Sequence, residues 1–100
     1  MRVLVIGTPK FQIPPDQLPS IVEGAIAWHE RYEDKFEAFG LFPGGGGFGV
    51  INVADEVELN QLILEMPFSW FSDVQIRAAV EPEVGWQQLQ QAVQAIGALA

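Results

Sequence analysis

The chain contains no cysteine, which excludes disulfide bonds, thiolate metal ligands and cysteine nucleophiles together. It has one histidine, His29, and only five lysines and arginines against 13 acidic residues. These cations are scattered and the formal net charge is −8, so a polyanion would be repelled rather than held by a basic patch. We therefore expect neither a metal nor nucleic acid as a partner.

Long apolar runs are also missing. No run approaches the ~20 residues that a membrane helix needs. The start, MRVLVIGTPK, is too short for a signal peptide. We therefore expect a cytoplasmic protein with no membrane partner. Hydrophobic residues nevertheless make up 49% of the chain, enough for one core at this length, so residues 1–100 are expected to form a single domain.

The first half of the chain predicts a strand, a helix and a second strand. Residues 2–8 are apolar on both faces, which is typical of a strand covered on both sides. Apolar spacings of three and four predict a helix over residues 20–39. Its expected apolar stripe consists of Val22, Ala25, Ile26, His29, Tyr32 and Phe36. A short strand at residues 38–42 should follow, ending in a mobile turn at Gly44–Gly47.

The stretch from Phe48 to Glu81 has the clearest pattern in the chain. A strand leads to Asp55, which should cap a helix because Glu58 follows three residues later, and Pro67 should close that helix. A second strand then alternates, with Val74, Ile76, Ala78 and Val80 on its apolar face. We expect Pro82 and Gly85 to break it. The last expected element is an uncharged helix over residues 86–100 with a stripe of Trp86, Leu89, Val93 and Ile96.

This order of elements predicts an α+β fold of the ferredoxin-like βαββαβ type, with a four-stranded antiparallel sheet and a C-terminal helix. Two helices cover only one face of such a sheet, yet the first strand is apolar on both faces. A second copy of the sheet is the simplest cover for the other face. We therefore expect a homodimer packed face to face, forming a dimeric α/β barrel, or a higher oligomer of such dimers.

The phrase GVINVADEVELNQLILEMPFSWFSDVQIRAAVE resembles the muconolactone isomerase-like branch of the dimeric α/β-barrel superfamily. The resemblance rests on packing and turn residues, including the Met66–Pro67–Phe68 hinge. It implies a ligand pocket between sheet and helices. Its members include isomerases, cofactor-independent monooxygenases, haem-degrading enzymes and proteins of unknown role. Muconolactone isomerases carry a Trp–Arg…Trp–Arg run in the second strand, whereas residues 37–42 here hold no cation.

His29 is the candidate acid–base residue. With Glu33 one helical turn later to orient it, a histidine in a pocket could move a proton at neutral pH. The alternative is a hydrogen-bonded structural histidine, which is the commoner role of a lone histidine without a partner motif.

Other side chains are candidates for ligand binding. Arg77 lies on the polar face of the last strand, where it could bind a carboxylate or pair with Asp73, Glu81 or a second copy. Aromatic side chains could line an apolar pocket or form plain core. These are Tyr32, Phe36 and Trp70, together with Trp28, Phe71 and Trp86.

Two functions follow from these features. The first is a homodimer that binds a small apolar or aromatic molecule, working without a cofactor as an isomerase or monooxygenase if it is an enzyme. The alternative is a non-catalytic binding or assembly module, whose glutamine-rich terminal helix docks on a neighbouring subunit or partner.

Overall fold

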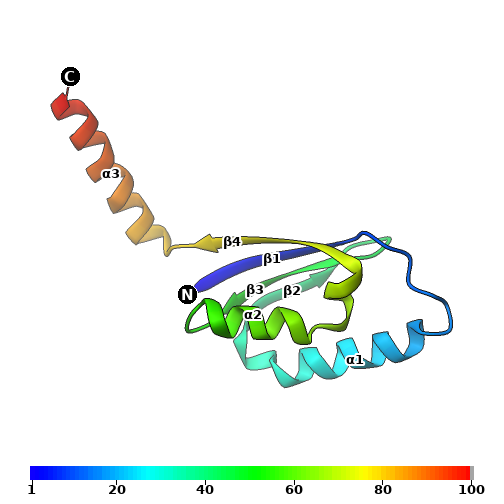
Figure 1. The fold of residues 1–100 in the computed structure, drawn as a ribbon. Helices are drawn as coiled ribbons and strands as arrows, with labels where there is room; N and C mark the ends of the chain where they lie inside the picture. Colours follow the sequence, from blue (N-terminus) through cyan, green and yellow to red (C-terminus); the bar gives the residue numbers. More distant parts are fainter. Residues whose placement is uncertain (100) are drawn as a thin grey trace.

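The computed structural model describes residues 1–99 of the chain and contains one four-stranded antiparallel sheet with strand order β2-β3-β1-β4. Helices α1 and α2 lie together on one side of this sheet (Figure 1). The elements are β1 (Arg2–Pro9), α1 (Leu18–Arg31), the 3-10 turn η1 (Glu33–Lys35), β2 (Phe36–Leu41), β3 (Gly47–Asn52), α2 (Glu56–Glu65), the 3-10 helix η2 (Pro67–Phe71), β4 (Ser72–Ala79) and α3 (Pro82–Leu99). Element order and strand order confirm the predicted ferredoxin-like fold.

The register of the central strand β1 assigns each residue to a face. Val3 pairs with Ile51 of β3 and with Ala78 of β4, and directly paired residues share a face. On β1 and β3 this face packs on the helices, with Val3 and Ile51 buried. On β4 the predicted apolar face is not covered, since Ile76 is 47% exposed. The other face, which we call the open face, carries Arg2, Leu4 and Ile6 of β1, Phe48, Val50 and Asn52 of β3, and Gln75, Arg77 and Ala79 of β4.

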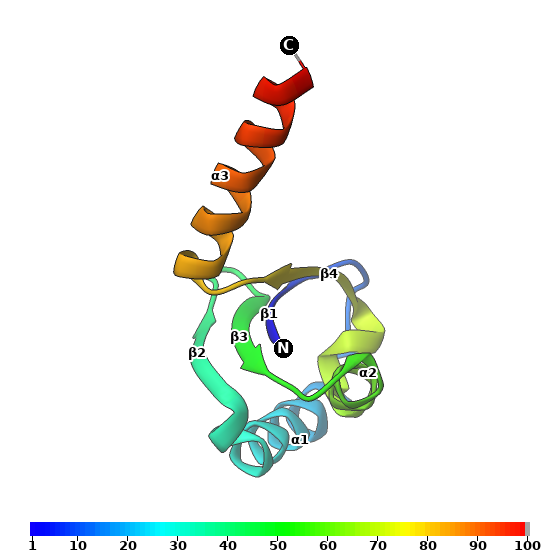
Figure 2. The same cartoon turned by 90° about the vertical axis from the view of Figure 1, so that its left-hand side faces the viewer.

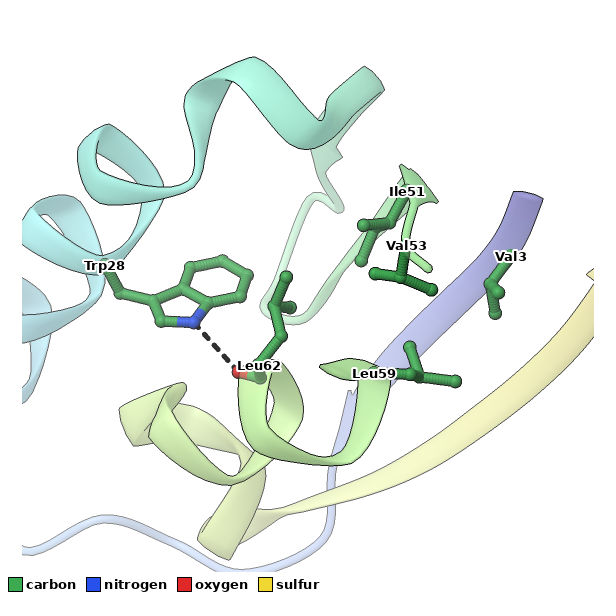
Figure 3. Packing of buried hydrophobic residues seen from close by; sticks show 6 residues of the cluster. All are labelled: Val3, Trp28, Ile51, Val53, Leu59 and Leu62. Carbon is green, nitrogen blue, oxygen red and sulfur yellow. Dashed lines mark hydrogen bonds between the residues drawn. The ribbon is translucent and has the colours of Figure 1, made fainter. Parts of the chain in front are cut away.

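The core lies between the sheet and the two helices, as predicted for the helix-covered face. Its buried members are Val3, Trp28, Ile51, Val53, Leu59 and Leu62 (Figure 3). The indole Nε1 of Trp28 donates a hydrogen bond to the backbone oxygen of Leu62 at 3.0 Å. Trp28 therefore fastens α1 to α2 by packing and by a hydrogen bond.

The predicted stripe and length of α1 were partly wrong. Val22 and Ile26 are 40% and 56% exposed, whereas Trp28 is 5% exposed, so the buried face centres on Trp28. The helix ends at Arg31 instead of residue 39, and Phe36 already begins β2. The 3-10 turn η1 between them brings Phe36 back to the core. The apolar spacing of three and four residues therefore runs past Arg31, although the helix has ended there.

Helix α2 was predicted correctly at both ends. Asp55 is its N-cap and accepts a hydrogen bond from the backbone N–H of Glu58 at 3.0 Å. The Glu58 carboxylate in turn accepts one from the N–H of Ala54 at 2.8 Å. The first bond satisfies an N–H group that the first helical turn leaves free, and the second ties the Glu58 carboxylate to the residue before the N-cap. Pro67 follows the end of α2 and begins η2, so β4 starts at Ser72.

The glycine-rich turn joins β2 to β3. Gly44, Gly45 and Gly46 have φ values of 85°, 119° and 84°, which residues with a Cβ rarely adopt. The turn is closed by a hydrogen bond from the N–H of Phe42 to the oxygen of Gly46 at 2.9 Å. Gly47 already belongs to β3.

Helix α3 leaves the sheet on the side opposite α1 and α2, and extends well beyond it (Figures 1 and 2). The molecule consequently measures 63 Å along its longest axis but only 26 and 23 Å across. The helix begins at Pro82 rather than at residue 86, because proline suits the first helical position. Position 100 of the predicted helix lies outside the described residues. No helix in residues 1–99 is long and apolar enough to cross a membrane.

Candidate functional site

The predicted acid–base residue, His29, lies where the C-terminal end of α1 meets β2. It is half-buried in the last turn of α1. Its ring centroid lies 4.2 Å from that of Phe39 and 5.2 Å from that of Phe36, both in β2. The imidazole is therefore held against an aromatic surface while part of the residue still reaches solvent.

The two phenylalanines beside His29 have different roles. Phe36 packs edge-on against Trp28 with ring centroids 5.4 Å apart, and a Cβ at Gly49 would lie only 2.8 Å from its ring. Phe36 is therefore fixed against the core. Phe39 is 40% exposed, so its ring provides the apolar surface that a ligand could contact.

Glu33 does not orient His29. It is exposed in η1 and makes no hydrogen bond or ion pair with His29 within residues 1–99. Helix α1 has ended before it, because Tyr32 has φ −107° and ψ 15°. A spacing of four residues places side chains on one face only while the helix continues. The structure therefore brings His29 to aromatic rings and not to the predicted acid.

Tyr32 ties α1 to α2. Its hydroxyl donates a hydrogen bond to the Glu65 carboxylate of α2, and this bond is the main reason that the pKa of Tyr32 is raised. Its ring packs edge-on against Trp28 at a centroid distance of 6.1 Å. The Tyr32 hydroxyl is thus already engaged within the fold.

Trp70 lies apart from the His29 site. It is 69% exposed in η2, and Figure 1 places η2 (yellow-green) at the opposite end of the sheet from the last turn of α1. In the described part of the chain, Trp70 makes no ring contact with the aromatic group around His29. The two predicted elements of a ligand site are therefore not brought together in one copy.

Arg77 faces away from the helices, as predicted, because it pairs with Leu4 on the open face. It makes no ion pair with any residue from 1 to 99. The two acids expected to pair with it take other partners: Asp73 lies 3.6 Å from Lys10, and Glu81 lies 3.0 Å from Arg2. The guanidinium of Arg77 is thus left on the open face.

A polar network at one end of the open face was missed by the sequence reasoning. Arg2 donates two hydrogen bonds to the Glu37 carboxylate, at 2.9 and 3.1 Å, and Asn52 donates a third at 2.8 Å. These bonds, first that of Asn52 and then those of Arg2, hold the pKa of Glu37 below its usual value of 4.5. Antiparallel pairing brings the start of β1 and β2 beside the end of β3 and β4, but placing Arg2 next to Glu37 requires the strand register.

The described residues show no site for a metal, since no three or more histidine, aspartate or glutamate side chains among them are placed to share an ion. The centre of the space between sheet and helices is filled by the buried core side chains. Two open depressions border α3 instead. The first is lined by Val80, Glu81, Pro82, Gly85, Trp86, Gln88 and Leu89, and the second by Trp86, Leu89, Gln90, Val93 and Gln94.

Comparison with protein-family models and with curated protein sequences finds no match. Comparison with solved structures does find similar folds. Muconolactone isomerase superposes with a TM-score of 0.71 at 15% identity, covering 82% of this chain and 92% of that one. A 5-chloro-2-hydroxyhydroquinone dehydrochlorinase from Burkholderia phenoliruptrix, solved in complex with 2,5-dihydroxybenzoquinone, superposes with a TM-score of 0.63 at 15% identity, covering 83% of this chain and 97% of that one.

Both matches span nearly the whole of the solved chains, and they confirm the predicted resemblance at the level of the fold. Identity of 15% carries no residue roles from either enzyme to this chain. The protein therefore has the ferredoxin-like α+β fold of muconolactone isomerase.

Proposed function

We propose that this protein binds a small, largely apolar molecule beside His29, on the flank between α1 and β2, and that it works as a cytoplasmic homodimer. The observation that carries the proposal is the partly exposed imidazole lying 4.2 Å from the ring of Phe39, which is itself 40% exposed. Ligand sites in proteins combine apolar and aromatic side chains with a few placed polar groups, and His29 beside Phe39 offers both.

The surroundings of His29 support an apolar ligand. Val22 and Ile26 of α1 are 40% and 56% exposed, and Leu41 of β2 is 76% exposed. Leu41 and Phe39 pair with Gly47 and Gly49, respectively, on the helix side of the sheet. Because the centre of the core is filled, a ligand would lie on this outer flank.

Proton transfer is the reaction that this site supports best. A carbonyl compound lying on Phe39 could present a C–H bond next to the carbonyl to His29. The imidazole would accept that proton and return it to another carbon of the same molecule, so atoms and electrons balance without a cofactor. The two solved enzymes of this fold, an isomerase and a dehydrochlorinase solved with a small quinone, support a small ring compound as ligand.

The single histidine makes the site testable by NMR, because its ring gives one set of imidazole signals. The probes are 2,5-dihydroxybenzoquinone and simple aromatic acids and lactones. We expect a saturable shift of the His29 ring signals with at least one probe, and loss of that response when Phe39 is changed to Ala. For a probe that is turned over, His29→Gln should lower the rate about 100-fold or more.

The matched control is Glu30→Gln, an exposed change on the same helix that should leave probe binding and turnover unaltered. His29 signals that stay unmoved by every probe, or turnover that survives His29→Gln, would contradict the proposal.

The second candidate is a non-catalytic assembly module, and the exposed apolar side of α3 favours it. In that case the protein would associate while no probe shifts the His29 signals. The two candidates are therefore separated by the same titration.

A further inference from the structure

One side of α3 is apolar and uncovered in the described chain. Its side chains recur at spacings of three and four, which places them on one side of the helix. They are Trp86, Leu89, Val93 and Ile96, with exposed fractions of 66%, 57%, 67% and 68%. A lone helix of 18 residues is only marginally stable in water, since most helix stability in proteins comes from packing. This side of α3 therefore requires a partner surface.

The charge distribution favours a second copy of this chain as that partner. Beyond Glu83 in its first turn, α3 contains no charged side chain. The whole chain carries a formal net charge of −8, so two copies repel one another over most of their surfaces. A cationic partner would be drawn to acidic surfaces elsewhere, whereas α3 lets a like-charged copy approach closely.

The position of α3 points to the same partner. It stands on the side of the sheet opposite α1 and α2, which is the side of the open face (Figures 1 and 2). The open face carries apolar side chains beside Arg77: Leu4 and Val50 pair with one another, and toward the glycine-rich turn the ring of Phe48 lies over Gly40, where a Cβ would meet it, and stacks on Phe42 at 5.9 Å. A copy seated on this face would lie beside α3.

Length also fits. A helix of 18 residues is about 27 Å long, while two stacked sheets lie ~10 Å apart. Helix α3 is therefore long enough to pass the partner's sheet and run along its flank.

The base of α3 continues the apolar surface into the sheet. Val80, 59% exposed, lines a depression together with Trp86 and Leu89 in the angle between β4 and α3. Glu81, the residue before α3 begins, is held by Arg2 at 3.0 Å. Among the residues that line this depression, Glu81 is the one charged residue, and its charge is paired with Arg2.

We propose that α3 is an arm that packs its Trp86–Leu89–Val93–Ile96 side against the second copy in the homodimer. By two-fold symmetry each copy gives one arm and receives one. The inference rests on the proposed homodimer and adds the surface that stabilises it.

The test compares two variants that each add one negative charge to α3. Val93→Glu lies within the apolar side, whereas Gln91→Glu lies on the opposite side of the same helix. Sedimentation equilibrium of the full chain should show a dimer that Val93→Glu weakens on the order of tenfold or more, because the added carboxylate would be buried against apolar surface. Gln91→Glu should leave the dissociation constant unchanged.

A third variant separates the arm from the homodimer itself. Val50→Glu, on the open face, should also weaken the dimer. If Val50→Glu weakens the dimer and Val93→Glu does not, the homodimer stands and the arm is refuted. If Val93→Glu weakens the dimer and Val50→Glu does not, the copies associate through α3 alone. That result would refute an arm that packs on a partner whose sheet faces the open face. A full chain that stays monomeric refutes both proposals.

Trp86 provides an independent readout. In Trp70→Phe, the remaining tryptophans are the buried Trp28 and the exposed Trp86. Acrylamide quenching should fall as protein concentration rises through the dimer dissociation constant. Quenching that stays constant across the transition would overturn the arm.

Discussion

At the scale of single residues, Trp28 joins the two helices that cover the sheet. We expect Trp28→Phe to lower the free energy of unfolding by about 1–3 kcal/mol, since it removes the only donor that the indole offers to the Leu62 carbonyl and leaves a space in the core. Urea denaturation followed by circular dichroism measures the difference.

Trp70→Phe is the matched control. It makes the same chemical change at a ring that is 69% exposed, so its effect should stay within about 0.5 kcal/mol. Equal losses from the two variants would show that Trp28 does not anchor α1.

The carboxylates of Glu37 and Glu58 predict how stability depends on pH. Hydrogen bonds from Asn52 and Arg2 lower the pKa of Glu37, and those from Lys35 and Ala54 lower the pKa of Glu58, each from a usual value of 4.5. A folded-state pKa below the unfolded one gives stability that is fully present above pH 4.5 and is lost as pH falls through the folded value.

We therefore expect the melting temperature to fall below pH 4.5, and Glu37→Gln to make that fall shallower, because the glutamine no longer titrates. Thermal unfolding between pH 7 and pH 3 measures both effects, with the exposed Glu23→Gln as control. An identical pH profile for wild type and Glu37→Gln would contradict the role of the open-face network.

At the scale of elements, the cap of α2 is a local device that can be removed alone. Asp55→Ala should cost about 1 kcal/mol of unfolding free energy, because the N–H of Glu58 loses its acceptor at 3.0 Å. Asn60→Ala, in the exposed middle of α2, should be neutral or slightly stabilising, since alanine favours helix. Chemical denaturation of both variants checks the difference, and equal values would show that the cap contributes nothing.

The three helices show why some element ends could be predicted from the sequence and others could not. The ends of α2 were predicted because a cap and a proline act within a few residues. The end of α1 was not, because Tyr32 and Phe36 keep helical spacing through a change to η1 and β2 that the core imposes. The start of α3 was misplaced since Pro82 can either break a strand or begin a helix.

The candidate site shows the same division between local and tertiary information. His29 was found from its residue type, yet its neighbour Phe39 was missed, because the contact depends on where β2 returns along α1. The predicted pairing of His29 with Glu33 required the helix to continue to Glu33, but α1 ends at Arg31. The Arg2–Glu37 pair joins residues 35 positions apart and requires the strand register, which the sequence pattern alone did not provide.

At the scale of the whole molecule, the acidic balance predicts how the proposed association of two copies would depend on salt. Each copy carries a formal net charge of −8, while the proposed contact surface on α3 has no charge beyond Glu83 and the open face combines apolar side chains with Arg77 and the Arg2–Glu37 pair. The repulsion therefore acts over long range and the attraction is apolar and short-ranged. Salt screens the repulsion, since the Debye length falls from about 30 Å at 0.01 M to about 8 Å at 0.15 M. The apolar attraction is left largely intact.

We accordingly expect the proposed homodimer to become tighter as sodium chloride is raised from 0.01 M to 0.15 M at pH 7, with most of the change complete by the higher value. Sedimentation equilibrium across this range gives the dissociation constant directly. An interface held by ion pairs across the two copies, for example from Arg77 to an acid of the second copy, would weaken with salt instead. Repeating the salt series with Arg77→Gln separates the two cases. If the attraction is apolar, the dissociation constant of the variant should fall with salt as it does in the wild type. If Arg77 bridges the copies, the dissociation constant should rise with salt in the wild type and fall with salt in the variant.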